Sequence, residues 1–221
     1  MAVKVTENEY GKVYIPVGTD YTYVSRSLLE GKVHEKETID YIVENAKIGV
    51  VHAGAGYGDF LPRLDTIDIP IFAFEPNKDN LEACINTIET NNLKNIVLKE
   101  QALSDKYGKG VLNRFDNFGR KTGTRCNLVE HSSTECQIST LDIEVDVPID
   151  LIHLDTEGGE INILKGATKL IEKYSPTVII EVEGAAVLHN EFMESIGYTP
   201  VKQLIHNADI MVFVNTVYKR K

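Results

Sequence analysis

Two short apolar runs, each followed by a distinctive turn, constrain the fold of this chain more than any other feature. Residues 48–52 (IGVVH) lead into a turn, residues 53–58, with glycine at every second position. Residues 71–74 (IFAF) end in the sequence EPN at 75–77. Glycine lets a backbone approach a ligand without Cβ collisions, and a carboxylate one strand over can accept both hydroxyl groups of a ribose. The pattern therefore predicts two buried strands whose ends bind a nucleoside.

The spacing of the glycines distinguishes between two nucleoside cofactors. Gly54, Gly56 and Gly58 form a G-x-G-x-G pattern, whereas a dinucleotide-binding turn has G-x-G-x-x-G and would need glycine at position 59. Asp59 stands there instead, and a carboxylate is unfavourable where a pyrophosphate should bind. S-adenosylmethionine (SAM) has no phosphate, so the turn favours SAM over NAD. A glycine-rich turn that binds no ligand is the remaining alternative.

The order of the expected elements indicates a Rossmann-like α/β fold. Strands alternate with helices, which is typical of a doubly wound, mostly parallel sheet that binds ligands at the carboxyl ends of its strands. The last two strands form an antiparallel hairpin, a feature of class I SAM-dependent methyltransferases and not of NAD-binding sheets. We predict strands at 48–52, 71–74, 95–98, 149–155, 177–182, 199–205 and 210–217, and helices at 34–46, 79–91, 159–174 and 191–196.

Two segments do not follow this alternation. Residues 1–30 contain short alternating stretches and predict a hairpin or arm. We therefore place an N-terminal arm and helix at residues 1–47 and the methyltransferase-like domain at 48–221. Residues 106–135 combine scattered glycines with a basic cluster between Arg114 and Arg125 and show no periodicity. A loop this long is either functional or wrongly assigned. It could bind an anionic substrate or be a solvated surface loop.

Composition and charge exclude several classes of partner. The net charge of −10 and the pI near 5.1 argue against nucleic acid or an anionic membrane as the main partner. No apolar run approaches the ~20 residues of a membrane-spanning helix, and residues 1–7 lack the apolar segment of a secretory signal. The three cysteines form no C-x-x-C pair, so no disulfide framework or structural zinc is expected. We expect a cytoplasmic protein, and a homo-oligomer is left open.

Several motifs in combination resemble the FkbM family of SAM-dependent methyltransferases. They are residues 53–60 (AGAGYGDF), 73–77 (AFEPN), 102–105 (ALSD) and 149–160 (IDLIHLDTEGGE), followed by 164–167 (LKGA) and 179–182 (IIEV). The resemblance covers about residues 48–185. It implies a class I methyltransferase fold with SAM as cofactor. It also implies O-methylation, because family members mostly methylate hydroxyl groups on sugars or natural products.

Two positions depart from the family pattern. The family has Asp where this chain has His52, and usually Lys where it has His153. An Asp at position 52 would help to hold the ammonium group of SAM. Asn is usual where Gly56 stands, which is a milder change.

We expect the cofactor contacts at the ends of the first three strands. The glycine turn would lie under the methionine part of SAM, and Glu75 would bind the ribose 2′ and 3′ hydroxyls, with a helix-cap role as its alternative. The segment after the third strand would flank adenine. The full predicted set is His52, Ala53, Gly54, Ala55, Gly56, Gly58, Glu75, Pro76, Asn77, Gln101, Ala102, Leu103 and Asp155.

The candidate catalytic residues are His153, Asp155 and Glu157. His153 and Asp155 alternate onto the same side of a strand, and a histidine has a pKa suited to accept a hydroxyl proton near neutrality. A satisfied buried histidine is the alternative. Methyl transfer is an SN2 step in which positioning dominates. Asp155 would contact cofactor or substrate, whereas Glu157 opens a helix, where the dipole favours acids anyway.

The predicted function is transfer of a methyl group to a hydroxyl of a small molecule or sugar. We expect no metal, although an oxygen-rich set could suggest Mg²⁺, whose octahedral geometry strand spacing cannot show. This set is Asp155, Glu157, Glu181 and Glu183. Two alternatives remain, an NAD-type oxidoreductase and a non-catalytic, methyltransferase-like binding protein.

Overall fold

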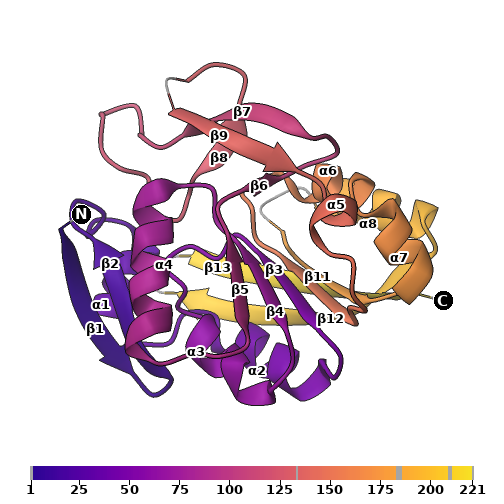
Figure 1. Ribbon diagram of the computed structural model, residues 1–221, viewed down its shortest axis with the longest axis horizontal. Coiled ribbons are helices and arrows are strands. Elements are labelled where there is room, and N and C mark those ends of the chain that lie inside the picture. The colour runs from indigo at the N-terminus through magenta and orange to yellow at the C-terminus, as the bar shows by residue number, and fades with distance from the viewer. Residues whose placement is uncertain (1, 133, 183–185, 209–210, 221) are drawn as a thin grey trace.

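The centre of the molecule is a seven-stranded sheet (Figure 1). The computed structural model describes residues 2–132, 134–182, 186–208 and 211–220. The strand order is β12-β13-β11-β10-β3-β4-β5, and β13 lies antiparallel between β11 and β12 while the other neighbours are parallel. The predicted fold class is therefore confirmed. The strands are β3 (Val50–Ala53), β4 (Ile71–Phe74), β5 (Ile96–Lys99), β10 (Leu151–Leu154), β11 (Thr177–Glu181), β12 (Tyr198–Ala208) and β13 (Met211–Arg220).

Helices cover both faces of this sheet because its central strands are apolar on both sides. Every residue of β3 and β10 is buried, as expected for parallel strands packed on two faces. Val50 and Leu151 pack with α2 and α3 on one face, whereas Val51 and Ile152 pack with α5 to α8 on the other. The helices are α1 (Tyr23–Leu29), α2 (Lys36–Asn45), α3 (Leu61–Leu64), α4 (Lys78–Thr90), α5 (Leu141–Glu144), α6 (Glu160–Lys165), α7 (Thr168–Tyr174) and α8 (Ala186–Ser195).

The N-terminal segment begins with the expected hairpin, formed by β1 (Val3–Asn8) and β2 (Gly11–Pro16). The hairpin packs on α4, where the backbone N–H of Tyr14 donates to Oγ1 of Thr87 at 3.2 Å. One of the alternating stretches within residues 1–30, at 21–24, suggested an extended segment, but this is wrong because α1 starts there with Thr22 as its N-cap. The domain boundary at residue 47 stays a prediction.

A second sheet replaces the loop that was expected at residues 106–135. Its four strands have the order β6-β9-β7-β8, and Figure 1 shows them at one end of the main sheet. They are short and mostly half-buried, and each pairs with a strand distant in sequence, so no local periodicity marks them. The strands are β6 (Ala102–Leu103), β7 (Gly108–Asn113), β8 (Asn127–Val129) and β9 (Thr134–Ser139).

The C-terminal half differs from the prediction in detail. The single helix expected at 159–174 is two helices, α6 and α7, separated at Gly166. A Cβ on Gly166 would lie 2.1 Å from the backbone oxygen of Ser104, so glycine allows this close approach. Helix α8 is longer than the predicted 191–196. Residues 209–210 of the hairpin turn and Glu183 of the oxygen-rich set lie outside the described residues.

Candidate functional site

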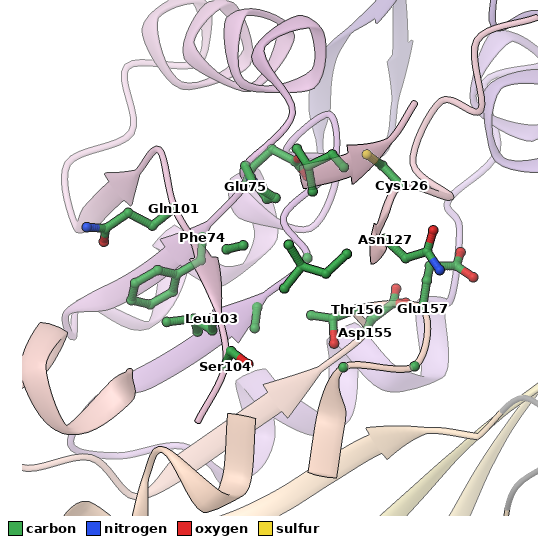
Figure 2. A pocket seen from close by; sticks show the side chains of 18 of the residues that line it. Phe74, Glu75, Gln101, Leu103, Ser104, Cys126, Asn127, Asp155, Thr156 and Glu157 are labelled. Carbon is green, nitrogen blue, oxygen red and sulfur yellow. The ribbon is translucent and has the colours of Figure 1, made fainter. Parts of the chain in front are cut away.

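The carboxyl ends of β3, β4 and β10 open into a pocket of about 830 Å³, part of it open solvent, and the second sheet contributes to its wall. Figure 2 shows Phe74 and Leu103 on one side of this pocket and Asp155 and Glu157 on the other. We call it the first pocket. The predicted site residues that line it are Ala53, Gly54, Glu75, Pro76, Gln101, Ala102, Leu103, Asp155 and Glu157.

Some predicted site residues do not line the first pocket, and some residues that line it were not predicted. The predicted contacts that are not on the described wall of the first pocket are His52, Ala55, Gly56, Gly58, Asn77 and His153. The wall residues that the sequence analysis missed are Phe74, Ser104, Leu112, Thr124, Cys126, Asn127, Leu128, Thr156, Gly158, Gly159 and Asn162. Motif 149–160 could have indicated three of these (156, 158 and 159), whereas segment 106–135 carried no signal for its members.

The glycine turn is required by contacts within the protein. Gly54, Gly56 and Gly58 have φ angles of 89°, 54° and 77°, in the region that favours glycine. A Cβ on Gly54 would lie 1.7 Å from the backbone oxygen of Asp155. Only glycine therefore lets the turn after β3 pass the segment after β10. Contact between Gly54 and a cofactor stays a prediction.

Glu75 ends β4 with its carboxylate directed at the glycine turn. Oε2 accepts a hydrogen bond from the backbone N–H of Gly56 at 2.8 Å, and Oε1 accepts one from Asn77 at 2.7 Å. Glu75 is 3% exposed, and burial raises the pKa of its carboxyl to about 7. Each carboxylate oxygen can accept about two hydrogen bonds, so acceptor capacity remains for a ligand. The helix cap belongs to Asn77, whose side chain accepts from the backbone of Asp79.

His52 and His153 form a buried pair on neighbouring strands. Their Nδ1 atoms are 2.9 Å apart, and both rings stack with Phe60. His52 is 2% exposed and His153 is 0% exposed. Burial lowers the pKa of both rings, that of His153 to about 4. One neutral ring therefore donates its N–H to the other.

This arrangement gives no support to His153 as the catalytic base. A general base must lie within hydrogen-bond reach of the proton that it takes. Among the described residues, neither His153 nor His52 lines the first pocket or the second pocket described next. A buried core position fits both histidines better than the predicted contacts, although Nε2 of His153 has no hydrogen-bond partner within the described part of the chain.

A second pocket joins the first at Gly54, Thr124, Asp155 and Glu157. It holds about 1480 Å³, including open solvent. Its other walls come from α1 and the segment before it, from residues 113–125, and from the end of β11. The remaining lining residues are Tyr21, Thr22, Tyr23, Val24, Arg26, His34, Asn113, Asp116, Asn117, Thr122, Arg125 and Glu181.

Two carboxylates lie where the pockets meet. Burial, reinforced by the neighbouring carboxylate of Glu181, raises the pKa of Asp155 well above its usual value. Glu157 has a φ angle of 57°, and its Oε1 is 3.7 Å from Nε of Arg125. The structure therefore brings the two predicted acids, Asp155 and Glu157, to one place, while His153 is buried on β10, two residues before Asp155.

The basic segment is largely neutralised by acids. Arg114 and Lys121 both pair with Asp79, at 2.8 and 2.9 Å. Arg120 pairs with Asp116 at 2.7 Å. These contacts do not favour the interpretation of this segment as an anion-binding site.

Comparisons with known proteins identify the family and agree with the fold. The family model described as "Methyltransferase FkbM domain" matches residues 52–200, more than half of the chain. Similar solved structures include a methyltransferase FkbM from Methylobacillus flagellatus KT, at 19% identity and TM-score 0.57, covering 78% of this chain and 44% of that chain. Another is a putative transferase from Pyrococcus horikoshii, at 12% identity and TM-score 0.58, covering 98% and 71%. M. jannaschii TYW2 in complex with AdoMet matches at 10% identity and TM-score 0.51, covering 99% and 87%.

The fold is that of a class I methyltransferase. The chain belongs to the FkbM methyltransferase family, so it is a methyltransferase and SAM is its cofactor. The NAD-type and non-catalytic alternatives are not supported. The chain spans less than half the length of the FkbM structure that it matches. Comparison with curated proteins gave no match. Within the described residues, no helix has the length and apolar character to cross a membrane.

Proposed function

We propose that the protein transfers the methyl group of SAM to a hydroxyl group of a small molecule or sugar. The observation that carries this proposal is the pair of pockets that share Gly54, Asp155 and Glu157. The first pocket would hold the cofactor and the second the acceptor, so that the reacting groups meet between them.

The residues of the first pocket fit the cofactor. Glu75 keeps acceptor capacity on both carboxylate oxygens, which suits the two ribose hydroxyls. Phe74, Leu103 and Leu128 give an apolar surface suited to adenine. Gly158 lies on the same wall, and a Cβ there would meet no atom within 4 Å, so the backbone is open to a ligand. Bound SAM would supply a methyl group on its sulfonium. The leaving group would be the sulfur, as the neutral thioether of S-adenosylhomocysteine.

The residues at the junction would position the acceptor for an SN2 step. A lone pair of the acceptor oxygen forms the new O–CH₃ bond, and the electron pair of the S–CH₃ bond stays on sulfur. We assign the released hydroxyl proton to the carboxylate of Glu157, whose side chain is 18% exposed and lines both pockets. Holding the reactants in line would supply most of the rate.

The second pocket favours a neutral, hydroxylated acceptor over a phosphodiester. Its charged wall contains Asp116, Asp155, Glu157 and Glu181 and fewer basic residues. With no cation bound, such a surface repels phosphate groups. Similar folds include a putative rRNA-methylase from Clostridium thermocellum and a tRNA methyltransferase from B. subtilis. The acidic wall and the net charge of −10 support a small acceptor here.

Transfer of labelled methyl from SAM would test the proposal. We expect label on members of a panel of sugars, glycosides and phenols, and none on RNA or protein; label on RNA alone would overturn the proposal. With an accepted substrate, Glu157→Gln should lower kcat by about 10²-fold or more and leave affinity for S-adenosylhomocysteine nearly unchanged. Glu135→Gln, at an exposed pair on β9, is the matched control and should change neither value.

A further inference from the structure

Three carboxylates from distant parts of the chain converge beside the second pocket. Glu35 immediately precedes α2, Asp155 follows β10, and Glu181 ends β11. Each offers an oxygen, and these atoms all lie within 4.8 Å of one another. Oxygen ligands bind Mg²⁺ at about 2.0–2.1 Å and Ca²⁺ at about 2.3–2.6 Å, so opposite ligands of one ion lie about 4–5 Å apart. The spacing therefore suits a single ion.

The second observation is the state of Glu35. This residue is 1% exposed, and its Oε2 accepts a hydrogen bond from Nδ2 of Asn215 at 2.7 Å. Its Oε1 is buried without a hydrogen-bond partner. Nε2 of His34 is 3.7 Å from this oxygen, too far for a hydrogen bond. A buried carboxylate that has one unpartnered oxygen and lies beside two further carboxylates requires a cation or a proton.

We propose that Glu35, Asp155 and Glu181 bind one divalent cation of the Mg²⁺ or Ca²⁺ type. Only oxygen ligands converge in this cluster, and such hard ions prefer oxygen. Glu35 is not on the described wall of either pocket, so an ammonium group on a substrate or cofactor would not reach it. A bare ion would.

The ion has a role that rests on the proposed function. Asp155 and Glu181 line the second pocket, so an ion between them would present an open coordination position to an acceptor. A hydroxyl oxygen bound there loses its proton more readily. The proton passes to Glu157, the oxygen takes the methyl group, and the ion itself is unchanged. This assignment replaces the expectation that no metal takes part.

Calorimetry on the full chain tests the site without SAM. The protein is treated with EDTA, dialysed, and titrated separately with MgCl₂ and CaCl₂. We expect one saturable site per chain for at least one of the two ions. Glu35→Gln and Glu181→Gln should each weaken binding at least tenfold, while circular dichroism shows that both variants are folded. Glu37→Gln is the matched control, because Glu37 is on the first turn of α2 with its side chain 48% exposed.

Several results would overturn the proposal. They are the absence of saturable binding by the wild-type chain at millimolar ion, and binding by Glu35→Gln equal to wild type. A loss of S-adenosylhomocysteine affinity in Glu35→Gln, without ion binding by wild type, would assign the cluster to the cofactor instead.

A parallel assay separates this site from the proposed function. If methyl transfer to hydroxyls persists while no ion binds, the cation site is wrong and the function holds. If the ion binds and no hydroxyl is methylated, the function is wrong and the site holds. If both the cation site and the proposed function are right, EDTA should lower activity at least tenfold, and Mg²⁺ or Ca²⁺ should restore it.

Discussion

The two pockets that meet at Gly54 are assembled in different ways. The first pocket takes much of its wall from turns that directly follow strands β3, β4 and β10. The second takes its wall from α1, residues 113–125 and the end of β11, which are far apart in the sequence. A cofactor common to many enzymes can be recognised by short local motifs, whereas an acceptor pocket is formed by distant segments that differ between enzymes. Perturbing each region separately should therefore separate cofactor binding from acceptor chemistry.

The largest effect is expected at Gly54, one of the residues that the two pockets share. Gly54→Ala places a Cβ where the backbone oxygen of Asp155 lies, at 1.7 Å, and also forces a φ angle of 89° on alanine. We expect a loss of about 4 kcal/mol or more in unfolding free energy, with loss of ligand binding. Gly119→Ala is the control, because its φ angle is 73° but no atom lies within 4 Å of its Cβ. It should cost about 1–2 kcal/mol, from backbone strain alone. Equal costs, measured by urea unfolding, would contradict the close crossing.

The histidine pair is buried and is not on the described wall of either pocket, so changes there should affect stability more than either kind of binding. The two residues that depart from the family pattern, His52 and His153, contact each other, with 2.9 Å between their Nδ1 atoms. His52→Asp or His153→Lys alone would bury an unpaired charge, at a cost of about 3–5 kcal/mol. The double variant pairs the charges and should recover about 1–3 kcal/mol of the summed costs. Additive costs in the double-mutant cycle would show that the two sites are independent.

Glu75→Ala should weaken the first pocket and leave the second intact. Loss of the ribose acceptor, and of the two backbone hydrogen bonds that Glu75 accepts, should reduce S-adenosylhomocysteine affinity by about 1.5–3 kcal/mol. Isothermal titration calorimetry provides the measurement, and Glu89→Ala on the exposed face of α4 is the control. Unchanged affinity in a folded Glu75→Ala protein would remove the ribose assignment.

The pH dependence of stability gives the smallest signal for a change of one pH unit, and the most specific one. Burial lowers the pKa of His153 to about 4 from an ordinary value of 6.5. Between these values the unfolded chain binds a proton that the folded chain does not, so unfolding free energy falls as pH falls. Relative to His153→Gln, the wild type should lose up to about 1.4 kcal/mol per pH unit from pH 6.5 toward 4. Parallel stability curves for the two proteins would show that the ring is not held neutral.

Local patterns predicted the main sheet and the cofactor edge because a buried parallel strand is a continuous apolar run. Residues 71–74 are such a run, and Glu75 follows on the pocket wall as expected. The second sheet could not be predicted in this way. Leu112 on β7 pairs with Leu128 on β8 across an intervening loop, and only tertiary contacts select that pairing.

The site residues follow the same division. His153 was assigned a base role from its strand position, but periodicity gives the side of a strand and not the depth of burial. Its 0% exposure depends on packing with Phe60 and His52. Glu35 carried no signal, because its approach to Asp155 depends on how α2 packs beside β10 and β11.

A crystal structure of the full chain with S-adenosylhomocysteine would test most directly whether the two pockets form one methyl-transfer site. We predict that the ribose hydroxyls lie within hydrogen-bond distance of Glu75 and that adenine contacts Leu103. The sulfur should face the junction at Asp155 and Glu157, with the second pocket free for an acceptor. A nucleoside bound among Tyr21, Tyr23 and Arg26 instead, away from Glu75, would contradict this division of the site.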